Sequence, residues 1–521
     1  MPEVSILNDV IGPVMRGPSS SHTAGAYRIA RLACALAGGS PAAIRCTFDP
    51  DGSYAPTCLP LGVDLAFAAG CLGWDMTDPR YFDAMRAAKQ AGLHIRFDVE
   101  PLAHAEHPNT IRMQIDPGAG SVIEVWAKSV GGGIVEICRL NGWPVSIDGR
   151  CWCLLAECDR AAGREWMMQV EKAAKTAVRA TVRESSGGML VQFDSDTPPT
   201  SDERRRLQSL CGANLVRSTP PVLYTQPGAS GIASAAALLE LARRESLSLG
   251  DAARLSESRL LRLSEATLTT EMLNRFAVMR SAVKAGLDDR NVDMPLTDPS
   301  AARMLRAEQA GRLPLGGILT RAAIRAMACM HICNSKGVVC AAPTGGSAGV
   351  LAGVLVTLED ECHVEPPTLA RALFAAGGVG LVMAARATFA AETAGCQVEI
   401  GVAGAMAAAA VVDAKGGTAQ QALDAAAIAL QNTMGSVCDP VGGGCEIPCH
   451  TRNAAAASSA FVCADLVVAG YANPIPLDDT VDASYAVGRV LPRELRCTAL
   501  GGISIAPSAL ALVQAKESRK A

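Results

Sequence analysis

The chain has 521 residues, of which 49% are hydrophobic, 4% aromatic and 19% charged. This length suits about three domains with their own cores and excludes a small disulfide-stapled module. Lys and Arg total 47 against 51 Asp and Glu, which gives a formal net charge of −4. Such a balance offers no polycationic surface, so we expect no nucleic-acid partner. The aliphatic bias excludes disorder and favours closely packed Ala-rich helices.

The cysteines and the N-terminal segment indicate the cellular location. The chain has 19 cysteines, an odd number that cannot all pair within one molecule. The opening segment MPEVS carries no basic region followed by a long apolar run, so we predict a cytoplasmic, reducing location. Two apolar runs, 341–358 and 401–412, are predicted to be buried helices, because the first contains Pro343 and the second is too short to span a bilayer. We expect no membrane partner.

The first half of the chain mixes helical and strand patterns. Helical spacing over 24–36, an extended run at 44–48 and alternation at 111–115 predict an α+β domain over 1–148. Residues 149–228 follow the order of a small βαββαβ domain. Its strands are expected at 151–156, 178–182, 189–193 and 214–216, and its helices over 165–175 and near Glu203.

The remaining part, 229–521, is rich in Ala and Leu with helical periodicity, and we predict an all-helical domain. Helices are expected over 235–244, 272–285, 321–332 and 419–433, with breaks at Pro343, Gly377, Pro440 and Gly501. The predicted architecture is therefore multidomain, with α+β, βαββαβ and all-helical parts in that order.

Three cysteines of the helical part, Cys396, Cys438 and Cys449, stand beside turn-forming or polar residues. Thiolates on short rigid turns can hold three irons of a [4Fe–4S] cluster and leave the fourth iron open to a substrate oxygen. Buried free thiols are one alternative, since the 42-residue gap between the first two is unlike a ferredoxin spacing. A zinc site of Cys438, Cys445, Cys449 and His450 is another, although it lacks a compact spacing.

A hydroxyl-rich turn at 17–26, with the sequence GPSSSHTAGA, precedes an amphipathic helix. The residues predicted to bind a substrate carboxylate there are Ser19, Ser20, Ser21, His22 and Thr23. Helix N-termini attract anions, and simple capping, which is the alternative, needs only one serine. Two glycine-rich turns, 129–133 and 342–349, are either tight structural turns or further anion-binding loops. The chain has no phosphate-binding loop motif and no lysine in a pyridoxal phosphate context.

Taken together, these motifs resemble the bacterial iron–sulfur-dependent L-serine dehydratases, in the form that fuses the β and α parts into one chain. The resemblance spans nearly the whole length and rests on ordered matches at 17–23, 129–133, 342–344, 395–399, 438–441 and 448–454. It implies that the βαββαβ segment is ACT-like, that the substrate is a small amino acid with L-serine as the default, and that the protein is a homodimer.

The resemblance also implies the chemistry of the site. Cys396, Cys438 and Cys449 would hold a [4Fe–4S] cluster, and water would leave from the β-hydroxyl to give an enamine that hydrolyses to a keto acid and ammonia. Residues expected near the cluster and the substrate, besides the hydroxyl-rich turn, are Thr344, Arg452 and Asn453.

The chain departs from the family pattern at three places. Leu61 stands where family members carry the histidine of a Gly-His-x-x-Asp stretch, so proton transfer falls to His22 or His450, or the substrate is not serine. Cys445 and the 450–451 pair, His-Thr, change the polarity beside a predicted ligand. The cysteine-bearing tail that caps the open iron in some relatives is missing from the sequence given, so we expect no such autoinhibition.

Two alternatives to serine dehydration therefore stay open. One is the same chemistry on a different substrate, either another β-hydroxy amino acid or cysteine, which would be desulfidated. The other is a relative that binds amino acids without catalysis. Retention of all three cysteines argues against the second, since a pure binder needs no open iron.

Overall fold

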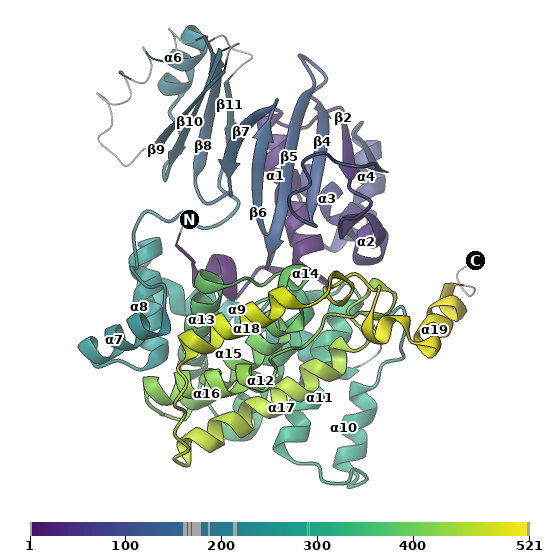
Figure 1. Ribbon diagram of the computed structural model, residues 1–521, viewed down its shortest axis with the longest axis vertical. Coiled ribbons are helices and arrows are strands. Elements are labelled where there is room, and N and C mark those ends of the chain that lie inside the picture. The colour runs from purple at the N-terminus through teal and green to yellow at the C-terminus, as the bar shows by residue number, and fades with distance from the viewer. Residues whose placement is uncertain are drawn as a thin grey trace. The chain divides into compact units, whose positions relative to one another are not determined.

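The computed structural model describes residues 3–159, 164, 168, 179–185, 188–211, 216–288, 290 and 292–517. The chain divides into two compact units, whose elements are labelled in Figure 1. The sheet unit consists of Ala24–Val130 and Ile134–Pro227. The helical unit consists of Met1–Thr23, Gly131–Gly133 and Gly228–Ala521. The hydroxyl-rich turn thus belongs to the same unit as the predicted cysteine ligands.

A six-stranded sheet forms the larger part of the sheet unit, in the order β3-β2-β4-β5-β6-β7. Strand β2 pairs in parallel with β3 and antiparallel with β4, and β4 pairs antiparallel with β5. The elements are α1 (Gly25–Leu36), β2 (Ala43–Phe48), α2 (Tyr54–Leu61), α3 (Val63–Cys71), α4 (Ala84–Gln90), β3 (His94–Val99), β4 (Thr110–Asp116), β5 (Ile123–Gly131), β6 (Ile134–Leu140) and β7 (Trp143–Ile147). Alternation in β4 buries Ile111, Met113 and Ile115 in the core, as the sequence predicts.

A four-stranded antiparallel sheet follows, in the order β11-β8-β10-β9. Its elements are β8 (Trp152–Cys158), β9 (Arg179–Ser185), β10 (Gly188–Ser195), α6 (Ser201–Cys211) and β11 (Val216–Thr219). Counted along the chain, the strands lie in the order fourth, first, third, second, which is the order of a split βαβ fold. The helix predicted over 165–175 lies outside the described residues.

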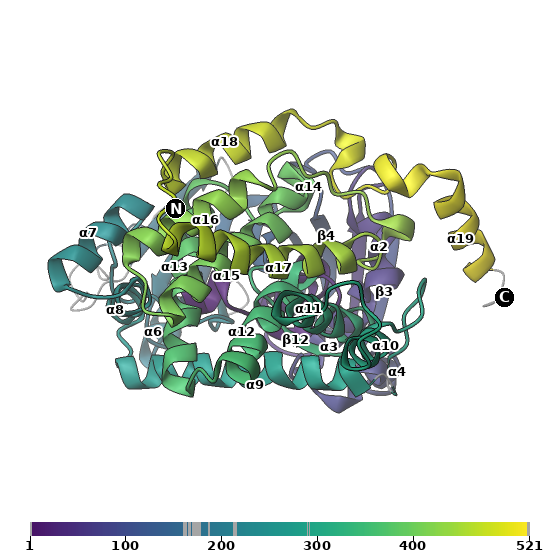
Figure 2. The ribbon, with the colours of Figure 1, turned by 90° about the horizontal axis from the view of Figure 1, so that it is seen from below.

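The helical unit contains α7 (Ala235–Glu245), α8 (Leu249–Leu261), α9 (Glu265–Asp288), α10 (Ala301–Gln309), α11 (Ile318–Asn334), α12 (Ala348–Cys362), α13 (Pro366–Arg386), α14 (Ala391–Ala394), α15 (Ile400–Ala414), α16 (Ala419–Gln431), α17 (Cys449–Val468), α18 (Leu477–Val490) and α19 (Pro507–Glu517). The central helix α15 packs against α12, α13, α16 and α17. It is almost entirely Ala, Gly and Val, and these short side chains allow its neighbours to approach closely. Figure 2 shows α19 extending away from the other helices of this unit.

Within the part of the chain that the structure describes, two helices are long and apolar enough to cross a membrane, namely α13 and the segment Cys396–Ala414. Their most apolar windows are 78% and 94% buried within the protein, as in core helices. The run 341–358, predicted as one buried helix, is α-helical only from Ala348 onward, after a short 3-10 turn at Gly345–Ser347. The short strand β12 (Val338–Cys340) and a turn precede it, because Pro343 lacks the N–H that a helix interior requires.

The N-terminal segment is built into the helical unit by two kinds of contact. Strand β1 (Val14–Arg16) pairs antiparallel with β12. The Glu257 carboxylate of α8 accepts hydrogen bonds from the N–H groups of Ile6 and Leu7, at 2.9 and 3.0 Å, and so caps the turn Ile6–Val10. The first residues are therefore fixed to the helices before the hydroxyl-rich turn begins.

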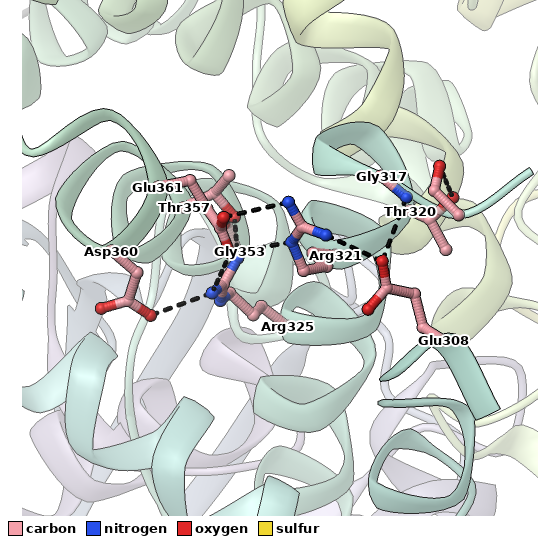
Figure 3. A network of polar contacts seen from close by, with 10 residues as sticks. Glu308, Gly317, Thr320, Arg321, Arg325, Gly353, Thr357, Asp360 and Glu361 are labelled. Carbon is pink, nitrogen blue, oxygen red and sulfur yellow. Dashed lines mark hydrogen bonds and ion pairs between the residues drawn. The ribbon is translucent and has the colours of Figure 1, made fainter. Parts of the chain in front are cut away.

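A network of ion pairs joins α10, α11 and α12 (Figure 3). Arg321 of α11 binds both carboxylate oxygens of Glu361, at 2.8 and 3.0 Å, and also Glu308, at 2.7 Å. Arg325, one turn later, binds Asp360 and Glu361, each at 3.0 Å. The network fixes the N-terminal end of α11 and the C-terminal end of α12, and the opposite ends of these two helices lie at the site described below.

Candidate active site

The hydroxyl-rich turn forms the first wall of the site. Residues Ser20–Ala24 form a single π-helical turn, a rare conformation that is frequent at functional sites. The Ser19 hydroxyl lies 2.9 Å from Nδ1 of His22, and His22 itself is buried. The hydroxyl of Ser20 accepts a hydrogen bond at 3.3 Å from the N–H of Gly345. This contact places the turn directly beside the 342–349 turn that the sequence singles out.

The C-terminal end of α11 contacts both the hydroxyl-rich turn and the 342–349 turn. A Cβ at Gly17 would lie 2.1 Å from the carbonyl oxygen of Cys333, so only glycine allows the chain to pass there. The Cys333 thiol donates to the carbonyls of Gly345 at 3.2 Å and Pro18 at 3.6 Å. The third glycine-rich segment is also near, since a Cβ at Gly132 would lie 3.6 Å from the Pro343 carbonyl.

The turn before α12 carries Thr344, which is buried. Thr344 forms a capping box with Ser347, whose hydroxyl lies 3.0 Å away. At Gly346 the absent side chain leaves space between three reactive groups. A Cβ there would lie 3.7 Å from Oε2 of Glu399, 3.8 Å from Sγ of Cys445 and 3.9 Å from Oγ1 of Thr344.

The three predicted ligands come from three separate segments and are all buried. Cys396 starts the short turn before α15, and its N–H donates to the Ser436 carbonyl at 2.9 Å. Cys438 follows in that adjoining loop, and Cys449 is the first residue of α17. Gln397 ties the first two segments together, because its side-chain oxygen accepts a hydrogen bond from the Gly435 N–H at 2.7 Å.

Two further thiols join the three predicted ones. Cys445 lies near enough to Cys449, and Cys497 to Cys438, for each thiol to affect the pKa of its neighbour. The backbone holds the second pair together, since the Cys497 N–H donates to the Cys438 carbonyl at 2.8 Å. The neighbouring Cys497 thiol, together with burial, raises the pKa of Cys438, whereas the neighbouring Cys445 thiol lowers the pKa of Cys449. Burial and the charge of Cys449 raise the pKa of Cys396.

Arg452 supplies positive charge beside the thiols. Its guanidinium donates to the Val437 carbonyl at 2.8 Å and to the Asp439 carboxylate at 3.0 Å. Although burial opposes it, the nearby thiols Cys396 and Cys449 raise the pKa of Arg452. Asn453, the next residue, is fully buried and donates to the carbonyls of Gly346 and Cys449, both at 2.9 Å. The predicted neighbours Thr344, Arg452 and Asn453 therefore all lie in this region.

His450 points toward α11. Its Nε2 lies 2.7 Å from the side-chain nitrogen of Asn334, and its ring centroid is 5.1 Å from that of His331. Because the amide nitrogen is the donor, Nε2 is the acceptor and the ring is neutral. Burial, with a contribution from His331, lowers the pKa of His450 to about 3. Both observations make His450 a weak proton acceptor at neutral pH.

The arrangement of the possible ligand side chains distinguishes a site for a single metal ion from a site for an iron–sulfur cluster. Among the described residues, no three His, Cys, Asp or Glu side chains converge on a position for a single metal ion. The zinc alternative has no support, since His450 is engaged with Asn334. A [4Fe–4S] cluster makes a different demand, because each thiolate binds its own iron and the sulfurs stand apart. Cys396, Cys438 and Cys449 meet the demand for three thiols from separate segments, since all three are buried and the charge of Cys396 acts on Cys438 and that of Cys449 on Cys396.

Comparison with known proteins adds the family. Residues 165–504, more than half of the chain, match the family model described as the serine dehydratase alpha chain. The chain belongs to the serine dehydratase alpha chain family. It is 35% identical over 271 residues to the probable L-serine dehydratase, alpha chain, of Bacillus subtilis, which covers 52% of this chain and 90% of that protein. The L-serine dehydratase, alpha chain, of Peptoniphilus asaccharolyticus is 37% identical over 228 residues, 44% of this chain and 78% of that protein.

The β part of the resemblance also has a counterpart among known proteins. The probable L-serine dehydratase, beta chain, of Bacillus subtilis is 44% identical over 141 residues, 27% of this chain and 62% of that protein. The chain therefore combines alpha-type and beta-type regions of the serine dehydratase family, and the resemblance inferred from the motifs is confirmed.

Sequence reasoning missed three contributors to the site. Asp439 and Glu399 lie inside the motifs 438–441 and 395–399, but their residue types alone indicate no particular role. Cys497 lies in no motif, and it reaches the site through the isolated bridge between Cys438 and Arg496.

Leu61, which replaces the family histidine, ends α2 in the sheet unit. It does not belong to the helical unit that contains the site residues described above.

Proposed function

We propose that this protein is a [4Fe–4S]-dependent lyase that converts a small β-hydroxy amino acid, by default L-serine, to a keto acid and ammonia. For L-serine the keto acid is pyruvate. The observation that carries the proposal is the continuous chain of contacts from the hydroxyl-rich turn through Gly345 and Gly346 to the thiols. Membership of the serine dehydratase alpha chain family supports it.

In this proposal each group of residues has a separate task. Cys396, Cys438 and Cys449 hold the cluster, and Arg452 offsets the negative charge of their thiolates. When bound, the cluster supplies a Lewis-acidic iron, which makes hydroxide a better leaving group. The hydroxyls and N–H groups of Ser19–Thr23 bind the substrate carboxylate. Burial of this region keeps bulk water away from the reacting groups.

His22 and His450 are the proposed residues for proton transfer. The geometry favours His22, because it belongs to the turn that would hold the substrate and its Nδ1 is oriented by the Ser19 hydroxyl at 2.9 Å. His450 is less suited, since its Nε2 is engaged with Asn334 and its pKa is lowered to about 3.

Anaerobic purification followed by iron and sulfide quantitation tests the cofactor. We expect the wild-type protein to contain iron and sulfide and to form pyruvate from L-serine. C438A should lose both the cluster and turnover, because one of three ligands is missing. C463A is the matched control, since Cys463 is equally buried on the same helix as Cys449 but 14 residues further along. Unchanged turnover in C438A would overturn the cluster-based mechanism.

A substrate panel tests the substrate. L-serine is compared with L-threonine and L-cysteine on cluster-loaded wild-type protein under anaerobic conditions. Pyruvate formation that is fastest from L-serine supports the default substrate. Faster turnover of another compound would replace L-serine, and no turnover of any of them would favour a non-catalytic amino-acid-binding protein.

We also propose that the four-stranded sheet of β8–β11 is an ACT-like domain. The split βαβ strand order supports this assignment, and the predicted strands at 178–182 and 189–193 coincide with β9 and β10. Calorimetric titration of the full chain with L-serine would reveal a second binding event if this sheet binds an amino acid, and a single event would argue against it.

A further inference from the structure

The proposed function leaves one group of the substrate without a binding partner. An amino acid such as L-serine presents a carboxylate, a hydroxyl and an ammonium group. The hydroxyl-rich turn is proposed to bind the first, and the cluster to take the second. An ammonium group that leaves water needs a negative charge or several acceptors around it. The following inference rests on the proposed function and identifies that partner.

Two of the site's acidic side chains differ in how their charge is balanced. Asp439 is compensated, because its oxygens accept hydrogen bonds from Arg452 at 3.0 Å and from the Ile503 N–H at 2.8 Å. Glu399 has no such partner. Its Oε2 and the Thr344 hydroxyl border the same position at Gly346, and no Lys, Arg or His among the described residues forms an ion pair with it.

Glu399 lies where a side chain that binds a ligand is expected to lie. The residue is half-buried, whereas Thr344, Gly346 and Cys396 around it are buried. Its Oε2 borders the space left by the missing side chain at Gly346, together with the Thr344 hydroxyl and the Cys445 sulfur. Glu399 thus lies between the turn that contacts Ser20 and the predicted cluster ligands.

An uncompensated carboxylate in this place is costly without a cation. Removing a carboxylate from water without a paired cation costs free energy, because the charged form loses its hydration. A cation bound next to the carboxylate offsets this cost, since opposite charges favour the ionised form. Thr344 provides orientation, because its hydroxyl is fixed by the capping box with Ser347.

We propose that Glu399, oriented by Thr344, binds the ammonium group of the substrate and makes the site selective for α-amino acids over the corresponding acids that lack the amine. The carboxylate accepts N–H hydrogen bonds from the ligand while the hydroxyl-rich turn takes its carboxylate. Glu399 is thereby a substrate-binding residue and remains unbonded to iron.

Binding of L-alanine and of propanoate to cluster-loaded enzyme tests this inference, because the two probes differ only by the amine and neither is turned over by loss of water. Affinities are measured by anaerobic calorimetry. We expect the wild-type enzyme to bind L-alanine about 10- to 100-fold more tightly than propanoate, as for a hydrogen-bonded charge pair. In E399Q this preference should fall to near unity, while propanoate affinity stays unchanged. Equal affinity in the wild type would overturn the inference without any variant.

Two further variants separate binding from structural roles. E399D keeps the charge and should retain part of the preference. E392Q is the matched control, since Glu392 is a neighbouring buried carboxylate and Glu399 is the one whose Oε2 borders the space at Gly346, so the preference should persist in E392Q. Iron and sulfide are quantified in each variant. Loss of the cluster in E399Q alone would mean that Glu399 supports the cluster rather than the substrate, and would overturn the inference.

Failure of the inference is distinguishable from failure of the proposed function. Pyruvate formation by the wild type together with an undiminished preference in E399Q would overturn the inference alone. Absence of pyruvate from cluster-loaded wild type, with a preference that E399Q removes, would overturn the proposed function alone.

Discussion

Ser20 accepts a hydrogen bond from the Gly345 N–H at 3.3 Å, although 325 residues separate them in the chain. The contact joins the hydroxyl-rich turn to the turn that carries Thr344 and Gly346. Cys333 reinforces it by donating to the carbonyls of both turns. The two turns therefore form one wall of the site, and changes in either are expected to affect binding.

Filling the space at Gly346 should block the site without unfolding the protein. In G346A the added methyl would lie in ordinary contact, 3.7 to 3.9 Å from Glu399, Cys445 and Thr344. We expect turnover to fall about tenfold or more, because a substrate displaced by a methyl group loses its reactive alignment. The thermal unfolding midpoint should stay close to that of the wild type. G404A on α15, where the nearest atom is 3.6 Å away on Ala456, is the control and should keep wild-type turnover.

Breaking the buried pair between Asp439 and Arg452 should destabilise the helical unit. In D439N, one charged acceptor for Arg452 and Ile503 is lost, which should cost about 1–3 kcal/mol of unfolding free energy. Urea denaturation measures this loss, and iron content should fall with it. D465N changes an exposed carboxylate on α17 and should stay within about 0.5 kcal/mol of the wild type. Equal effects of the two variants would contradict the assigned role of the pair.

His107 in the sheet unit should make stability fall at acidic pH. Its Nδ1 accepts a hydrogen bond from the Asn109 N–H at 3.1 Å, which requires the neutral ring. Burial, together with the charge of Lys128, lowers the pKa of His107 to about 4, against an ordinary value of about 6.5. Because the pKa is lower in the folded state, the stabilisation is complete above about pH 6.5 and is lost as the pH falls toward 4.

The expected loss attributable to His107 is about 1–2 kcal/mol between pH 7 and pH 5. Hydrogen exchange of the β4 amides across this pH range measures it locally. H107N cannot titrate there, so its exchange should show a flatter dependence on pH after correction for intrinsic rates. An identical pH dependence in wild type and H107N would rule out this contribution.

The network in Figure 3 should contribute more to stability than an isolated surface pair. Arg321 makes a two-point contact with Glu361 and a third contact with Glu308, and its side chain is only 28% exposed. R321M should therefore cost about 1–3 kcal/mol. R244A removes an ion pair with Glu245 whose members are 58% and 39% exposed, and it should cost less than about 1 kcal/mol. Thermal denaturation of both variants compares the two losses.

Local patterns predicted most elements of the fold. The predicted helix at 24–36 and strand at 44–48 agree with α1 and β2 to within one residue at each end, because burial on one face repeats with the period of the element. The ordered motifs predicted that the ligands lie near Thr344, Arg452 and Asn453. In the structure these residues lie in one region.

Long-range contacts were not predictable in the same way. The pairing of β1 with β12 involves three residues on each side, too few for any pattern to indicate partners more than 300 positions apart. Cys497 is placed beside Cys438 by two backbone hydrogen bonds, which leave no mark in residue type. The orientation of His450 toward Asn334 likewise depends on how α17 packs against α11, and no spacing along the chain specifies it.

The discontinuity of the helical unit has a consequence for biosynthesis. Its first strand leaves the ribosome early, whereas the strand that pairs with it is translated only after the sheet unit has been completed. Since domains fold as units during translation, the nascent N-terminal segment must wait unpaired while the intervening polypeptide acquires its own structure. Premature termination before β12 would leave that segment exposed to proteases and chaperones.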